Sequence, residues 1–189
     1  MGELIHFVHQ SLDGFIEGPN GEFDWPRMDS ELSAYSQELM SGDAVFLYGR
    51  VVWEMMSSFW PQAEQHSTHE HDLAFAPLWR KASKVVVSRT LEKADWDARV
   101  ISENVVEELT ALKRSSSRLL LFGGSVLASF LTERGVIDEY QVFVHPVILG
   151  GGKPLFQEQS HRVGLELVES RTFGSQVVLL RHRREDPRG

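Results

Sequence analysis

Three short apolar runs in this chain each end in small or polar residues and lead into a segment with helical patterning. The run 44–48 is followed by Gly49-Arg50, the run 85–87 by Ser88-Arg89-Thr90, and the run 119–122 by Gly123-Gly124-Ser125. Continuous apolar runs of this length are typical of buried strands, and their alternation with helices is typical of an α/β sheet. The sequence therefore predicts the same arrangement three times: a buried strand, then small or polar residues, then a segment that leads into a helix.

The Gly49-Arg50 pair shows what such a strand end can bind. Backbone N–H groups at a helix N-terminus are unpaired and partly positive, so a phosphate group can lie there. Arg50 adds a full positive charge and a bidentate donor. Three strand ends with glycine, serine or arginine together predict the binding site of one nucleotide.

Composition limits the other possibilities. The 189 residues, 42% of them hydrophobic, fit a single domain over 1–189 with a sizeable core. A net charge of −8 argues against nucleic acid as a partner, and the absence of cysteine excludes disulfides and thiolate chemistry. The N-terminus has no basic segment followed by a long apolar run, and no apolar stretch is long enough for a membrane span. We expect a soluble cytoplasmic protein with no membrane partner.

The expected elements alternate through the first two thirds of the chain. We expect strands at 4–9, 44–48, 84–88 and 118–122, and helices at 29–40, after Gly49, in a short segment up to Lys81 that Pro77 breaks or starts, at 104–113 and at 125–133. Asn104 is expected to cap its helix and Gly135 to end one. Asp13-Gly14 is expected to form a turn, and 17–26 and 61–72 to form loops.

The last third changes character. Strands are expected at 138–144, 164–172 and 176–182, and the last two form a hairpin that turns at 173–175. The sheet is therefore expected to be mixed, with parallel strands first and an antiparallel edge last. The charged tail 181–189 is expected to fray.

Five motifs in order carry a family resemblance. They are Ser11-Leu12-Asp13-Gly14, the segment from Gly49 to Glu54, Val87-Ser88-Arg89-Thr90, Gly123-Gly124-Ser125, and the segment from Pro146 to Phe156. Together they resemble the dihydrofolate-reductase-like superfamily, and more closely the C-terminal reductase domain of the bifunctional riboflavin-biosynthesis deaminase-reductase and its stand-alone relatives. The resemblance implies a three-layer α/β fold with a mixed, mostly parallel sheet flanked by helices, NADPH as hydride donor, and a pteridine- or pyrimidine-like acceptor.

The resemblance also implies which residues hold the cofactor. The adenosine half and its 2′-phosphate are assigned to Gly49, Arg50, Ser88, Arg89 and Thr90, and the pyrophosphate to Gly123, Gly124, Ser125 and Val126. Two arginines and several hydroxyls suit a dianionic phosphate, which favours NADPH over NADH. The alternatives are surface arginines near helix ends and an ordinary strand-to-helix turn. Val52 replaces a threonine of dihydrofolate reductases, so one phosphate-side hydroxyl is lost.

Near the nicotinamide, the resemblance places Ser11, Asp13 and Ile16. Asp13 is equally well explained as a turn-forming residue. Hydride transfer to the acceptor requires a proton, and Asp29, which follows Trp25-Pro26, is the candidate acid. The alternative for Asp29 is the N-cap of the following helix.

The departures from the riboflavin enzymes fall on the acceptor side. Phe122 and Phe7 stand where those enzymes have a glutamate and a lysine, and their Asp-rich stretch is replaced here by 55–61, which contains two methionines, a phenylalanine and a tryptophan. These changes convert a polar phosphosugar site into an apolar one. The acceptor is therefore expected to be flat and less charged than the riboflavin intermediate.

Two further segments have open interpretations. The histidines His66, His69 and His71 could bind a metal ion, but we interpret this run as a solvated loop and predict no metal. Trp53 is expected in the core, whereas Phe59 and Trp60 fit the core and cofactor stacking equally well. The loop Gly150-Gly151-Gly152 borders the substrate cleft in relatives, whose edge strands often pair across a dimer axis, so the resemblance implies a homodimer.

Three functions remain open from the sequence. The first is an NADPH-dependent oxidoreductase that reduces a small pteridine-, pyrimidine- or other heteroaromatic-like or carbonyl compound. The second is the 5-amino-6-(5-phosphoribosylamino)uracil reductase of riboflavin biosynthesis. The third is a non-catalytic nucleotide- or ligand-binding homodimer on the same fold.

Overall fold

The computed structural model describes residues 2–116 and 118–185, and its centre is one eight-stranded sheet. The strand order is β5-β4-β3-β6-β1-β7-β10-β9. These strands are β1 (Glu3–Ser11), β3 (Val45–Gly49), β4 (Ser83–Val87), β5 (Arg99–Ile101), β6 (Arg118–Phe122), β7 (Glu139–His145), β9 (Leu165–Thr172) and β10 (Val178–Arg184). Two short strands, β2 (Phe15–Glu17) and β8 (Lys153–Pro154), pair separately.

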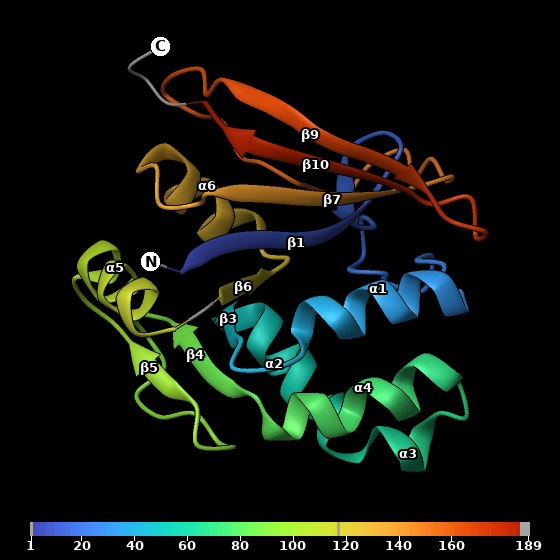
Figure 1. Cartoon of the computed structure of the whole chain (residues 1–189), viewed down its shortest axis with the longest axis horizontal. Coiled ribbons are helices and arrows are strands. Elements are labelled where there is room, and N and C mark those ends of the chain that lie inside the picture. Colours follow the sequence, from blue (N-terminus) through green and yellow to red (C-terminus); the bar gives the residue numbers. More distant parts are fainter. Residues whose placement is uncertain (1, 117, 186–189) are drawn as a thin grey trace.

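One strand of the large sheet, β10, runs in the opposite direction to the other seven. The six strands from β5 to β7 in this order are parallel to one another, whereas β10 pairs antiparallel with both β7 and β9. In Figure 1, β9 and β10 form the upper edge of the sheet, far from the helices that follow β3. The prediction of a mixed, mostly parallel sheet with an antiparallel C-terminal hairpin is confirmed.

Helices cover the two faces of the parallel part and complete three layers. One face packs against α1 (Ser30–Met40), α2 (Arg50–Phe59) and α4 (Glu70–Lys81), and the other against α5 (Val105–Ser115) and α6 (Ser125–Glu133). Successive residues of a strand point to opposite faces. On β1, Ile5 and Phe7 accordingly join the first core, while Leu4 joins the second. No helix in the described ranges is long and apolar enough to cross a membrane.

The prediction of a loop at 61–72 is wrong. This stretch contains η1 (Trp60–Gln62), α3 (Ala63–His66) and the start of α4, which continues through Pro77 to Lys81. Packing overrides the polar composition, because Ala63 is fully buried and the Trp60 ring meets Phe75 edge-on with 4.5 Å between centroids.

Other boundaries also differ from the prediction. The strands β2, β5 and β8 were not predicted; each is only two or three residues long. The charged residues up to Arg184 belong to β10 and are not a frayed tail, whereas 186–189 lie outside the described residues. Asn104 stands at the N-cap of α5 in a left-handed conformation, but its side chain does not cap the helix.

The order of the strands places a crevice between β3 and β6. The chain leaves β3 towards β4 on one side, and it leaves β6 towards β7, which lies beyond β1 on the other side. In open α/β sheets, ligands bind outside the carboxyl ends of the strands at such a switch point.

Candidate functional site

The N-termini of two helices, each preceded by a glycine, lie at this switch point. Gly49 is the N-cap of α2 and Gly124 is the N-cap of α6, and neither end receives a side-chain capping hydrogen bond. The glycine turn before α6 lies against the first helical turn of α2, since a Cβ atom on Gly124 would lie 3.6 Å from Cγ2 of Val52. Gly123 and Gly124 have φ angles of +49° and +75°, which glycine adopts without strain. The crevice therefore combines free backbone N–H groups from two helix N-termini, an arrangement that suits an anion.

The first residue of α6 adds an unexplained polar group. Ser125 is 1% exposed, and its Oγ has no hydrogen-bond partner among the described residues. Buried polar atoms without partners are rare in folded proteins. This hydroxyl lies directly after the glycine turn, where a bound oxygen would satisfy it.

The predicted 2′-phosphate residues lie at the ends of two adjacent strands. Gly49 on β3 is in register with Val87 on β4, so Ser88 and Arg89 follow immediately beside the start of α2. Ser88 Oγ accepts hydrogen bonds from the N–H groups of Thr90 and Leu91, which fixes the turn. Arg50 is half-exposed and donates to Glu54 at 2.9 Å.

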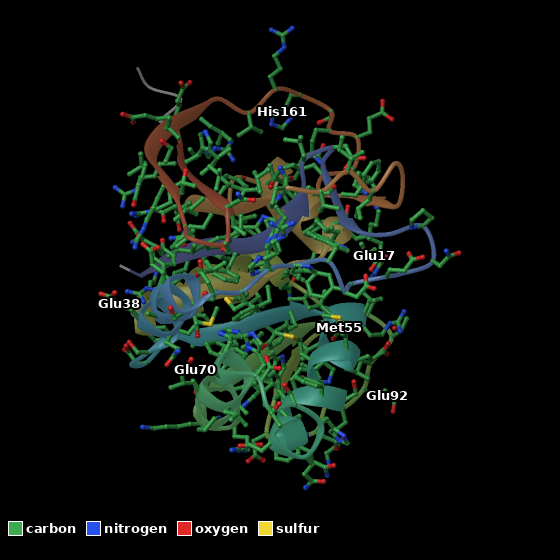
Figure 2. The ribbon with its side chains drawn as sticks, turned by 90° about the vertical axis from the view of Figure 1, so that its right-hand side faces the viewer. Glu17, Glu38, Met55, Glu70, Glu92 and His161 are labelled. Carbon is green, nitrogen blue, oxygen red and sulfur yellow. The ribbon has the colours of Figure 1, made fainter. Side chains whose placement is uncertain are left out.

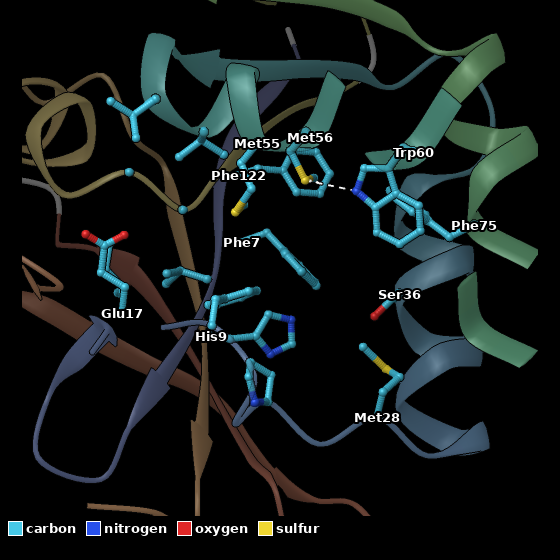
Figure 3. A pocket seen from close by; sticks show the side chains of 18 of the residues that line it. Phe7, His9, Glu17, Met28, Ser36, Met55, Met56, Trp60, Phe75 and Phe122 are labelled. Atoms are coloured by element: carbon cyan, nitrogen blue, oxygen red, sulfur yellow. Dashed lines mark hydrogen bonds between the residues drawn. The ribbon is translucent and has the colours of Figure 1, made fainter. Parts of the chain in front are cut away.

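A largely apolar cavity of about 310 Å³ lies beside the two helix N-termini. It is bounded by β1, β6, α1, α2 and α4, and Figure 3 shows the side chains that form its walls. Its large apolar groups include Phe7, Met55, Met56, Trp60, Phe75 and Phe122. Figure 2 shows Glu17 and Met55, which both line the cavity, on the same side of the molecule.

Charge is scarce along the cavity wall. Its ionisable residues are Glu17, Asp72, His9 and His71, and no lysine or arginine of the described chain lines it. Glu17 is paired with Lys153 at 3.0 Å. The expectation of an apolar acceptor site agrees with this geometry, since Phe7 and Phe122 both face the space.

The residues predicted near the nicotinamide are only partly brought together. Ile16 lines the cavity, whereas Ser11 is buried in the turn and its Oγ accepts a hydrogen bond from the N–H of Phe15. The Asp13 carboxylate accepts hydrogen bonds from the N–H groups of Leu149 and Gly150. The pKa of Asp13 is lowered, mainly by its hydrogen bond with Ser11 and further by these two amide contacts. Asp13 therefore joins the turn after β1 to the glycine-rich loop and lies outside the cavity wall.

Asp29 has the contacts of a helix cap. Its carboxylate accepts a 2.8 Å hydrogen bond from the N–H of Leu32 and another from the N–H of Ser175. Partial burial acts to raise the pKa of Asp29, but these amide donors bring it below its usual value. An acid that stays ionised and lies outside the main cavity is poorly placed to give up a proton. We therefore assign Asp29 the capping role.

The histidine run is not a solvated loop. His71 lies in the first turn of α4, its ring stacks on Phe75, and its Nδ1 is 2.9 Å from Ser33 Oγ. Desolvation lowers the pKa of His71. Within 2–116 and 118–185, no three His, Asp or Glu residues are grouped as a metal site. Trp53 lies in the core as predicted, and Trp60 faces the cavity.

The sequence interpretation missed His9. This side chain follows Phe7 on the same face of β1 and enters the cavity next to it (Figure 3). Its Nδ1 lies 2.8 Å from Nε2 of His145 on β7. The period-two alternation of β1 was the only sequence signal that could have pointed to His9.

The match to a family model agrees with this architecture. Residues 3–179 match the model of the RibD C-terminal domain. The chain belongs to the RibD C-terminal domain family. The Bacillus subtilis (strain 168) protein YyaP is 37% identical over 172 residues, which cover 89% of this chain and 87% of YyaP.

Two solved structures show the same fold. A putative riboflavin biosynthesis protein from Shewanella sp. PV-4 has a TM-score of 0.75 and 20% identity, covering 98% of this chain and 100% of that one. Dihydrofolate reductase from Enterococcus faecalis, complexed with NADP(H), has a TM-score of 0.67 and 16% identity, with 98% of each chain covered. The predicted dihydrofolate-reductase-like fold is confirmed.

Proposed function

We propose that this RibD C-terminal domain protein is an NADPH-dependent reductase of a small, flat and uncharged acceptor. The proposal is carried by one observation: two uncapped, glycine-led helix N-termini meet beside a cavity with apolar walls. The first feature suits the phosphates of a dinucleotide, and the second suits a ring that receives a hydride.

The residues at the switch point fit the cofactor. Gly123, Gly124 and Ser125 would hold the pyrophosphate, and the orphaned Ser125 hydroxyl would gain a partner there. Arg50 and Arg89 would hold the 2′-phosphate, for which Arg50 must exchange its contact with Glu54. NADPH, when bound, supplies the hydride. The chain contributes binding, orientation and exclusion of water at the apolar wall.

The cavity favours an uncharged acceptor over a phosphorylated one. A phosphoribosyl group needs cationic partners, yet the ionisable residues on the described wall are two acids and two histidines. The reduction of 5-amino-6-(5-phosphoribosylamino)uracil is therefore the less supported activity. Homodimer formation stays a prediction; β9, with exposed Leu165, Leu167 and Val168, offers the edge for it.

Replacing Arg50 by alanine tests the cofactor site. We expect NADPH to bind about tenfold more weakly or worse in Arg50→Ala, because a hydrogen bond to a charged group contributes about 1.5–3 kcal/mol. NADH affinity should change much less, since NADH lacks the 2′-phosphate. Calorimetric titration measures both constants.

Arg99→Ala is the matched control. Arg99 also forms an exposed ion pair, with Glu108, but it begins β5 at the amino edge of the sheet. We expect this variant to bind NADPH like the unmodified protein. Unchanged NADPH affinity in Arg50→Ala would contradict the assigned site.

A further inference from the structure

We propose that His9 presents its Nε2–H to the cavity as a fixed, uncharged hydrogen-bond donor. The acceptor molecule must then carry a hydrogen-bond acceptor atom at that point, such as a carbonyl oxygen or an unprotonated ring nitrogen. This inference rests on the proposed function only in taking the ligand of the cavity to be the acceptor.

The argument begins at the far end of a short hydrogen-bond chain. The backbone N–H of Arg27 donates to Nδ1 of His145 at 3.0 Å. A peptide nitrogen can only donate, so Nδ1 of His145 carries no proton. The neutral ring of His145 therefore has its proton on Nε2.

The same reasoning fixes the tautomer of His9. Nε2 of His145 lies 2.8 Å from Nδ1 of His9, and because it carries a proton, His9 Nδ1 must accept. The proton of neutral His9 is therefore on Nε2. In the described part of the chain, no hydrogen-bond partner is found for this nitrogen, and the His9 ring lines the cavity.

The surroundings keep both rings uncharged. A second proton on His9 would sit on Nδ1 and face the Nε2–H of His145. A second proton on His145 would sit on Nδ1 and face the N–H of Arg27. Burial is the main cause that lowers the pKa of His9, and the nearby His145 and His71 lower it further. Burial is also the main cause that lowers the pKa of His145 to about 4, and the positive charge of Arg27 adds to this effect. Asp72 on α4 and Glu17 on β2 are the other ionisable groups on the cavity wall.

Aromatic packing holds the donor in one direction. The His9 ring stacks on Phe143 with 5.0 Å between centroids and meets Phe7 edge-on at 5.3 Å. Figure 3 shows Met28 and Ser36 across the cavity from His9. A flat ligand that fills this apolar space would bury His9 Nε2, and one without an acceptor atom would leave that buried donor unpaired.

The first test reads the tautomers directly in the full-length protein. Long-range proton–nitrogen NMR spectra distinguish protonated from unprotonated imidazole nitrogens, and we expect Nε2 to carry the proton in both His9 and His145. Because burial lowers the pKa of His9, His9 should stay neutral at a pH where an exposed imidazole already takes up a proton. In His145→Phe, which removes the positioning partner, His9 should populate both tautomers. A proton on Nδ1 of His9 in the unmodified protein would overturn the proposal.

The second test uses two molecules of equal shape. Isoquinoline has a ring nitrogen acceptor and naphthalene has none, so we expect isoquinoline to bind about five- to tenfold tighter. This preference should disappear in His9→Phe and persist in His9→Gln, whose amide still donates. His71→Phe, which changes another cavity histidine, should keep it. An unchanged preference in His9→Phe would overturn the inference.

Neither test contains NADPH. A failure of the His9 inference therefore leaves the cofactor site standing, and a failure of NADPH binding leaves the hydrogen-bond donor standing.

Discussion

Replacing Trp79 by alanine is expected to lower the free energy of unfolding by about 3–5 kcal/mol, the usual cost of emptying a large aromatic site in a core. Trp79 is fully buried, stacks on Trp53 and donates from Nε1 to the Tyr48 hydroxyl at 3.1 Å. Its ring also lies 4.5 Å from the Lys84 ammonium. The change therefore removes apolar contacts and a hydrogen-bond donor together. Denaturant unfolding measures the loss.

Two companion variants separate these contributions. Trp79→Phe keeps an aromatic ring but leaves the Tyr48 hydroxyl without its donor, and we expect a smaller loss of about 1–3 kcal/mol. Trp96→Ala removes a tryptophan that is 47% exposed and should cost less than either. If Trp79→Ala were no less stable than Trp96→Ala, the packing described for α4 would be wrong.

Acid is expected to destabilise the protein through histidines that are buried without charge. Burial lowers the pKa of His6 from 6.5 to about 4, against a smaller opposing effect of its hydrogen bond to the Gly123 carbonyl. Below the unfolded value the unfolded chain binds more protons than the folded one, so stability falls as the pH falls from 6.5 towards 4. For His6 alone the loss by about pH 4.5 is about 2–3 kcal/mol.

The variant His6→Gln isolates this effect. Glutamine can still donate to the Gly123 carbonyl but does not titrate, so stability between about pH 7.5 and pH 4.5 should vary by about 2–3 kcal/mol less than in the unmodified protein. Denaturant unfolding at several pH values gives both curves. Val8→Ala changes a buried residue on the same face of β1, and it should lower the free energy of unfolding by the same amount at every pH. If the free energy of unfolding changed equally with pH in His6→Gln and in the unmodified protein, His6 would not be a buried, uncharged histidine.

The parallel core of the fold could be predicted because local signals and tertiary structure agree there. The apolar runs that end at Gly49 and Gly123 are central strands buried on both faces, so they contain few of the polar residues that blur a pattern. The helix Ser125–Glu133 begins and ends where predicted, since Gly124 and Gly135 mark its ends.

The charged end of the chain could not be assigned in this way. Arg181 looks like part of a frayed tail, but it makes two 3.0 Å contacts with Glu139, which is buried on β7, and a further one with Glu169. The partners are 42 and 12 residues away in the sequence. Local composition carries no information on such pairing, so a strand stabilised by ion pairs was interpreted as a solvated tail.

The candidate site was predictable on the cofactor side and only partly on the acceptor side. Glycine and arginine at strand ends are local signals with a physical meaning. The contact between His9 and His145 joins residues 136 positions apart, and it depends on the pairing of β1 with β7. Asp29 had two interpretations; its hydrogen bond from the N–H of Leu32 is the helix cap, and Ser175, far along the chain, donates a second hydrogen bond to the same carboxylate.

The most direct test of the proposed function is a titration of the purified protein with NADPH and, separately, with NADH, followed by tryptophan fluorescence. Trp53 lies in α2, the helix whose N-terminus is assigned to the cofactor phosphates, and Trp60 faces the cavity. We predict saturable binding of NADPH that is clearly tighter than that of NADH. If neither nucleotide binds by fluorescence or by calorimetry, the assignment of a nicotinamide cofactor is contradicted.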